Sequence, residues 1–214
     1  MSDDPRPRRT QEERRADAEH RLLDAAAELI TEIGPARITL ANIGERAGYS
    51  RGLATHHFGS KGAMMQRLVD AVTAQFRAAV FANSQSDSVL DEALGLIDTY
   101  FAALAHPAPI NRARLMLWAD AVVAGSPEVA PTMLAADREF RDELTKLIQR
   151  GIASRQFADS VNPDGLATAV VGMLRGIALQ HLLDPQVDLG AARAEAERLL
   201  INRVNPPQQK EANL

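Results

Sequence analysis

Apolar residues recur every three or four positions along most of this chain, the spacing that places them on one side of an α-helix. No stretch shows the alternation of apolar and polar residues that is typical of a strand. Breaks such as Gly34-Pro35 divide the pattern into segments, and Thr10, Ser126 and Asn162 are predicted helix N-caps. We therefore expect an all-α fold of about nine helices, over residues 10–33, 39–47, 50–58, 60–82, 88–104, 110–123, 126–154, 162–183 and 189–203.

Two short segments with helical spacing follow each other closely between positions 39 and 58. In the first, Thr39 is the predicted N-cap and Gly48 the stop. In the second, Ser50 is the predicted N-cap, and Ala54 and Phe58 are expected to pack inward because they are four residues apart. This is the layout of a helix-turn-helix. The residues that its second helix directs outward, and that can therefore reach DNA, are Arg51, Gly52, Leu53, Thr55 and His56.

The same region is free of acidic residues. Between positions 46 and 69 there is no aspartate or glutamate, while Arg46, Arg51, Lys61 and Arg67 are present together with two histidines. Such a basic window suits the phosphate backbone of a nucleic acid.

These residues resemble the TetR family of transcriptional regulators, which carries a pattern close to T-x-x-x-I-A-x-x-A-G-[VYI]-S-x-G-x-[LI]-Y-x-x-F-x-S-K-x-x-[LM]. The matching residues are Thr39, Ile43, Ala47, Gly48, Tyr49, Ser50, Gly52, Phe58, Ser60, Lys61 and Met64. The departures are Gly44 for the usual alanine, Ala54 for the usual leucine, and Thr55 where the family most often has tyrosine. That tyrosine typically bonds a backbone phosphate. Thr55 keeps a hydroxyl but has a shorter reach, which leaves His56 or His57 as candidates for part of the role.

The resemblance implies a DNA-binding domain over residues 1–61, a ligand-binding and dimerisation domain over 62–204, and a disordered tail over 205–214. Residues 1–10 are expected to be disordered, although Arg6, Arg8 and Arg9 could instead form an arm that reaches the minor groove. The expected DNA contacts are Thr39, Ser50, Arg51, Gly52, Leu53, Thr55, His56, His57 and Lys61.

The resemblance further implies that the last two helices pair with those of a second copy in a four-helix bundle. Gly172 and Gly176 support this, because two glycines four residues apart let helices approach closely, although tightly packed monomer cores show the same spacing. A dimer would place two recognition helices about 34 Å apart, in successive major grooves. The predicted interface residues are Gly172, Gly176, Leu179, Leu183 and Leu199.

The central helices carry large or adaptable apolar residues of the kind that line pockets for hydrophobic ligands. The candidates for an effector site are Phe101, Arg114, Met116, Trp118, Met133 and Phe140, of which most could equally be core. Four polar residues in apolar segments could contact a ligand or form pairs at the dimer interface: Arg114, Asp120, Arg175 and His181. The pattern gives no identity for the effector.

Composition narrows the function classes. With 46% hydrophobic and 24% charged residues the chain is that of an ordinary soluble globular protein, and its absence of cysteine rules out disulfides and thiolate metal sites. The net charge of −4 argues mildly against a nucleic-acid binder, but residues 1–61 are neutral, with 10 basic and 10 acidic residues. Adjacent histidines at 56 and 57 face different directions on a helix, so no metal and no cofactor is expected. We find no secretion signal and no apolar run near the length of a membrane span, which favours the cytoplasm.

We therefore predict a ligand-responsive regulator that is not an enzyme. It would bind palindromic double-stranded operator DNA as a homodimer, most often as a repressor in this family, and would be released by a small-molecule effector. The alternatives are an activator, an all-helical enzyme acting on a small molecule, and a helical adaptor that uses the helix-turn-helix for protein contact. Against an enzyme, no Ser-His-Asp set, phosphate loop or metal-ligand spacing can be assigned.

Overall fold

The computed structural model describes residues 10–81, 88–105 and 108–205. Within these ranges every element of secondary structure is a helix, as predicted. The nine helices are α1 (Gln11–Ile33), α2 (Leu40–Arg46), α3 (Leu53–Phe58), α4 (Lys61–Phe81), α5 (Val89–Ala105), α6 (Pro109–Val123), α7 (Ala130–Ala153), α8 (Pro163–Leu183) and α9 (Leu189–Val204). The predicted arginine arm and almost all of the predicted disordered tail lie outside the described residues.

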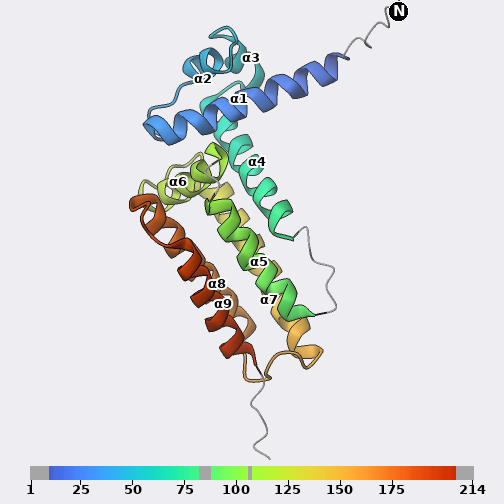
Figure 1. The fold of residues 1–214 in the computed structure, drawn as a ribbon. Coiled ribbons are helices and arrows are strands. Elements are labelled where there is room, and N and C mark those ends of the chain that lie inside the picture. Colours follow the sequence, from blue (N-terminus) through green and yellow to red (C-terminus); the bar gives the residue numbers. More distant parts are fainter. Residues whose placement is uncertain (1–9, 82–87, 106–107, 206–214) are drawn as a thin grey trace, which may run out of the picture.

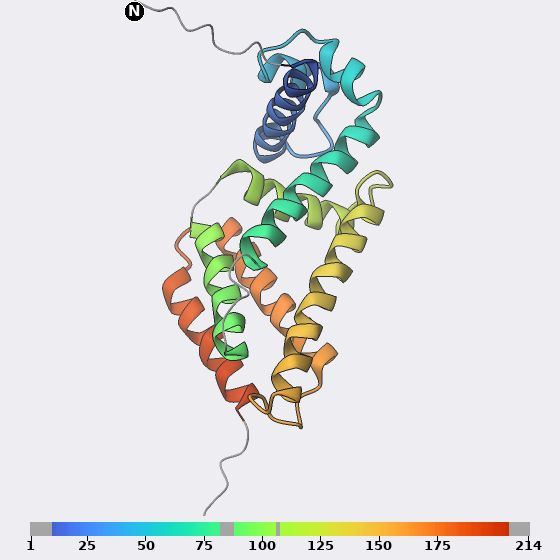
Figure 2. The same ribbon diagram turned by 90° about the vertical axis from the view of Figure 1, so that its right-hand side faces the viewer.

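The helices form a small head and a longer body, which α4 connects (Figure 1). In the head, α1, α2 and α3 gather at one end of the molecule. In the body, α5, α7, α8 and α9 run lengthwise towards the other end, and α6 crosses between the two parts (Figures 1 and 2).

Two hydrophobic cores correspond to these parts. The head core holds fully buried residues of α1, α2, α3 and the first half of α4, among them Leu22, Ile43 and Met64. It also includes Ala113 and Leu117 of α6, so α6 packs directly under α1. The body core joins the second half of α4 to α5, α7, α8 and α9.

Three predicted N-caps are confirmed. The Thr10 hydroxyl accepts from the Glu13 N–H and the Glu13 carboxylate accepts from the Thr10 N–H, which is a complete capping box. Thr39 forms the same reciprocal arrangement with Asn42. The Asn162 side chain accepts from the Gly165 N–H at 2.8 Å.

Two other predicted caps are wrong. Ser50 does not cap α3, whose N-cap is Gly52 with no side-chain hydrogen bond; the Ser50 backbone carbonyl instead accepts from the Leu53 N–H at 3.0 Å. Ser126 does not cap α7, because residues 127–129 form a turn and the helix begins at 130. In both places the backbone carbonyl of the serine, and not its side-chain hydroxyl, accepts the hydrogen bond at the start of the turn.

Among the described residues, α8 is long and apolar enough to cross a membrane by length and composition, although it contains no uninterrupted apolar run of that length. In its most apolar 18-residue window, 28% is buried inside the structure. The remaining residues of α8 are half-buried or exposed in the single chain, among them the apolar Leu179 and Leu183.

Candidate nucleic-acid interface and cavity

The turn between α2 and α3 is tight because two glycines permit it. Gly48 follows the end of α2 with φ +79°, a conformation that side-chain-bearing residues rarely adopt. The next N–H, that of Tyr49, donates to the Gly44 carbonyl at 2.9 Å. A Cβ at Gly44 would lie 2.7 Å from the Ser50 carbonyl oxygen, so the two backbone segments approach more closely than an alanine would allow.

The second helix of this pair presents its predicted faces. Ala54 is fully buried and Phe58 packs against the head core, which fixes the inward side of α3. Arg51, Thr55 and His56 are exposed on the outward side, and Gly52 is exposed at its start. Leu53 is half-buried. The exposed side of α3 therefore carries one hydroxyl and one imidazole, and the guanidinium of Arg51 lies in the turn just before the helix.

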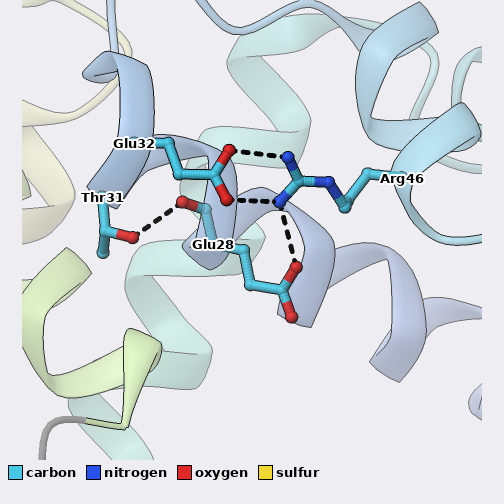
Figure 3. Close-up of polar contacts among 4 residues, drawn as sticks. All are labelled: Glu28, Thr31, Glu32 and Arg46. Carbon is cyan, nitrogen blue, oxygen red and sulfur yellow. Dashed lines mark hydrogen bonds and ion pairs between the residues drawn. The ribbon is translucent and has the colours of Figure 1, made fainter.

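Residues 46–69 contain no acidic residue, but in the folded chain glutamates of α1 lie next to their cations. The Arg46 guanidinium, at the end of α2, is bonded to Glu32 at 2.6 and 2.8 Å and to Glu28 at 3.1 Å, both on α1 (Figure 3). The hydrogen bonds that Arg46 donates to Glu32, and then to Glu28, raise the pKa of Arg46, and the bonds that Glu32 accepts lower the pKa of Glu32. Arg46 thus fastens α2 to α1 and is not a free DNA contact.

Glu19 of α1 plays a similar part for α3 and α4. Its carboxylate bonds Arg67 of α4 and lies 3.2 Å from Nε2 of His57, whose side chain is only 10% exposed. Burial on its own raises the pKa of Glu19, but the hydrogen bonds from Arg67 and His57 outweigh it and lower that pKa. His57, predicted as a DNA contact, therefore faces α1.

The two remaining cations differ in how they are held. Lys61, at the start of α4, donates from Nζ to the Ala36 carbonyl at 3.0 Å and so fastens α4 to the loop before α2. Arg51 is paired with Glu45 of α2, yet its side chain stays 77% exposed. Of the two lysine and arginine residues predicted to contact DNA, Arg51 is therefore the more exposed.

A small cavity of about 40 Å³, partly open to solvent, lies between α4, α5, α6, α7 and α8. Four of the six predicted effector residues line it: Arg114, Trp118, Met133 and Phe140. The other two do not, because Phe101 is buried in the body core and Met116 packs against the head core. Arg175, one of the four polar candidates, also lines the cavity. The rest of the lining was not predicted from the sequence: Thr73, Phe76, Arg77, Tyr100, Ala136, Asp137, Val171 and Leu174.

Two arginines that line this cavity, Arg175 and Arg114, differ in their neighbours. Arg175 forms an ion pair with Asp137 at 2.6 Å, and its guanidinium lies 4.5 Å from the centre of the Trp118 ring. Arg114 is 9% exposed, and its guanidinium lies 3.8 Å from the centre of the Phe76 ring. Burial lowers the pKa of Arg114 and raises that of the neighbouring Tyr100 hydroxyl, because removal from water disfavours the charged form of each.

Of the five predicted dimer residues on α8 and α9, Gly172, Leu183 and Leu199 are exposed, and Gly176 and Leu179 are half-buried. Leu183 is 88% and Leu199 is 59% exposed, while Leu179 is half-buried. A Cβ at Gly172 or Gly176 would meet no atom within 4 Å. Asp120 and His181, the other polar candidates, line surface hollows away from the cavity. In the described residues no group of three side chains could hold a metal ion.

Comparison with known families covers both parts of the molecule. Residues 22–68 match the family described as bacterial regulatory proteins, tetR family, and residues 89–202, more than half of the chain, match the BetI-type transcriptional repressor C-terminal family. The chain belongs to the TetR family of transcriptional regulators. The first match spans α2, α3 and the parts of α1 and α4 that pack on them, so it coincides with the head.

Individual relatives of this TetR-family regulator are distant. The HTH-type transcriptional regulator BetI of Stenotrophomonas maltophilia is 27% identical over 158 residues, which are 72% of this chain and 79% of the relative. BetI of Escherichia coli is 39% identical over 59 residues, and this match spans 28% of the chain and less than a third, 30%, of the relative. Among solved structures, the complex of SmeT with triclosan superposes with a TM-score of 0.74 at 22% identity, over 87% of this chain and 90% of that one; SmeT is the repressor of a Stenotrophomonas maltophilia efflux pump.

Proposed function

We propose that this TetR-family regulator is a homodimeric repressor that binds a palindromic operator and is released when a small molecule occupies the cavity between α4 and α8. It would act in the cytoplasm, where its operator is. The observation that carries the proposal is that α4 and α6 each form part of the cavity wall and part of the head core.

Two neighbouring faces of α6 contact different parts of the molecule, because residues four positions apart lie on the same face of a helix. Ala113 and Leu117, four residues apart, are fully buried in the head core. Arg114 and Trp118, each one position further, lie on the neighbouring face and line the cavity. A ligand that displaces Arg114 or Trp118 therefore pushes on the helix that supports α1.

A second connection runs along α4. Met64 and Leu68 near its start are fully buried under the helix-turn-helix, and Phe76 near its end lines the cavity. Because a helix moves as a rigid rod over such distances, a tilt caused at the cavity changes the direction of the head. In a dimer, such tilts change the distance between the two recognition helices, and the differential affinity of the effector for the two arrangements drives release.

The DNA contacts that we propose are Arg51, in the turn before α3, and Thr55 and His56 of α3, with Gly52, Leu53 and the start of α2 at Thr39 close to the phosphates. Arg51 would exchange its partner Glu45 for a base or phosphate. Lys61 and His57, which are held by Ala36 and Glu19, would act by fixing the position of α3 and α4.

The dimer that we propose is formed by α8 and α9. Supporting it are the exposed Leu183 and Leu199, the open space beside Gly172 and Gly176, and the low buried fraction of the apolar α8. Two copies facing each other would cover these positions in one continuous interface.

Replacement of Arg51 tests the DNA-binding part. Arg51→Ala should weaken operator binding about 5- to 150-fold and change the preferred sequence, because a bidentate contact of Arg to a base discriminates by about 1–3 kcal/mol. Arg21→Ala, at an exposed arginine of α1, is the matched control and should leave the preferred sequence unchanged. The proposal fails if Arg51→Ala binds the operator with unchanged affinity and sequence preference.

A further inference from the structure

One arginine of the cavity, Arg114, has no ion-pair partner among the described residues. Arg77 is paired with Glu139 and Glu143, and Arg175 is paired with Asp137. No carboxylate in the described ranges lies within ion-pair distance of Arg114, although nine-tenths of this residue is buried. A buried charge without a partner is costly, and groups of this kind call for a specific explanation.

Two polar atoms at this point also lack hydrogen bonds within the described part of the chain. One is Nε of Arg114 and the other is the Tyr100 hydroxyl, in a residue that is only 5% exposed. Both face the same cavity. A guanidinium can only donate, and a phenol hydroxyl can donate as well, so a ligand that satisfied both would offer acceptor oxygens. A carboxylate offers two, in the geometry that a guanidinium matches.

The same cavity is poorly suited to a cation. Aromatic faces are what a quaternary ammonium group uses, but the Phe76 ring is already covered by Arg114 and the Trp118 ring by Arg175. A cationic ligand would also meet the uncompensated charge of Arg114. The electrostatics therefore favour a ligand of the opposite sign.

The remaining surroundings are apolar. A second, smaller cavity of about 20 Å³ lies next to the first, separated from it by Phe140 and Leu174, which line both. Its lining consists of apolar side chains alone, from α5, α7, α8 and α9 and the loop after α7. An apolar body that displaced Phe140 or Leu174 could extend into it from a head held at Arg114.

We propose that the effector is an amphipathic carboxylate, with its carboxylate bound by Arg114 and Tyr100 and its apolar body packed against Phe76, Phe140 and Leu174. This rests on the proposed function of the cavity as the effector site. It adds the chemical class of the ligand, and it assigns Arg114 as the residue that selects the head group.

The test uses the full chain and three apolar bodies, octyl, 4-phenylbutyl and cyclohexylmethyl, each carrying a carboxylate, a primary amide or a trimethylammonium group. Trp118 is the only tryptophan of the chain and lines the cavity, so its fluorescence reports binding there. At least one carboxylate should bind about 10- to 100-fold more tightly than its amide, the range expected for hydrogen bonds to a charged group. The corresponding trimethylammonium compound should bind more weakly still.

Arg114→Met removes the charge while keeping a side chain of similar length. It should abolish the preference for carboxylate over amide, whereas Arg112→Met, at an exposed arginine of the same helix, should retain it. Loss of the buried charge should also raise the thermal midpoint of the unliganded Arg114→Met protein, which shows that the variant is folded. The proposal is overturned if no carboxylate binds, if the amide or ammonium compound binds as tightly, or if the preference survives in Arg114→Met.

A separate measurement of operator affinity distinguishes this proposal from the proposed function. If a carboxylate binds at Trp118 without weakening operator binding, the ligand class stands and the role of the cavity in release fails. If operator release is produced by the amide or ammonium compounds instead, the regulatory role stands and the carboxylate assignment fails.

Discussion

Replacing Gly176 with leucine should have opposite effects on the single chain and on the dimer. In the single chain a Cβ at Gly176 meets no atom within 4 Å, so a side chain can be accommodated there. Because glycine in a helix interior is about 0.8–1 kcal/mol less favourable than a good helix former such as leucine, α8 should gain roughly that amount. The monomer should therefore fold at least as stably as the parent protein.

The dimer should be weakened substantially. Overpacking by a large side chain costs about 1–3 kcal/mol at each site, and a twofold interface contains the substitution twice, so the loss is about 2–6 kcal/mol. At 1.4 kcal/mol for each factor of ten, this raises the dissociation constant of the dimer about 30-fold to 10⁴-fold. Sedimentation over a series of protein concentrations measures this constant directly.

Gly95→Leu is the matched control. Gly95 lies in the interior of α5, where a Cβ also meets no atom within 4 Å, and α5 is outside the proposed interface. This variant should gain helix stability and keep the dissociation constant of the dimer. An unchanged constant in Gly176→Leu would refute the placement of the interface on α8.

Three further substitutions test the packing of the head and body. Gly44→Ala should lower the free energy of unfolding by about 1 kcal/mol despite the better helix propensity of alanine, because the new Cβ would lie 2.7 Å from the Ser50 carbonyl oxygen. Titration with operator DNA should show weaker binding by this variant. A more stable variant with full operator affinity would contradict the prediction. Gly151→Ala should lower the thermal midpoint by about 4–8 °C, equivalent to about 2 kcal/mol, since its Cβ would lie 2.3 Å from the buried Phe157 ring; calorimetry showing no decrease would rule out this contact. Glu19→Gln should destabilise the protein by about 1 kcal/mol at pH 7. Because the folded-state pKa of Glu19 is lowered, the stability that Glu19 contributes is present above its ordinary pKa of 4.5 and is lost as the pH falls through the folded-state pKa. The free energies of unfolding in urea of the parent and the variant should therefore converge below pH 4.5. A difference that stays constant with pH would argue against the ion pair.

The helices could be predicted well because their signals are local. The capping box at Thr10 and the cap at Asn162 each depend on residues three positions apart, and glycine or proline marks most of the ends. Ser50 and Ser126 misled for the same reason. A serine before a helical segment indicates a cap, but the backbone carbonyl can hold the turn equally well, and the sequence does not distinguish the two.

The electrostatics of the head could not be predicted because the partners are distant in sequence. Glu19 pairs with Arg67, 48 residues later, and Glu32 pairs with Arg46, 14 residues later. Both acids lie on α1, outside the window that contains no acid. The window therefore predicted a surface of free cations where the structure shows mostly paired ones.

The cavity was predictable only in part. Arg114 was noticeable as a charge in an apolar segment, and Trp118 as a large aromatic residue close to it. Phe76 and Tyr100 carry no such signal, because a large residue on the apolar side of a helix is usually core. Their importance follows from the ring of Phe76 under Arg114 and from the unpaired hydroxyl of Tyr100, which only the folded arrangement shows.

The central claim is that this protein reads a specific operator as a dimer. Incubating it with random-sequence DNA duplexes, and selecting and sequencing the bound fraction at two salt concentrations, tests this most directly. We predict enrichment of a palindrome with half-sites one helical turn apart and a steep loss of affinity at higher salt, because phosphate contacts release counterions. Absence of any enriched sequence at both salt concentrations would contradict the account.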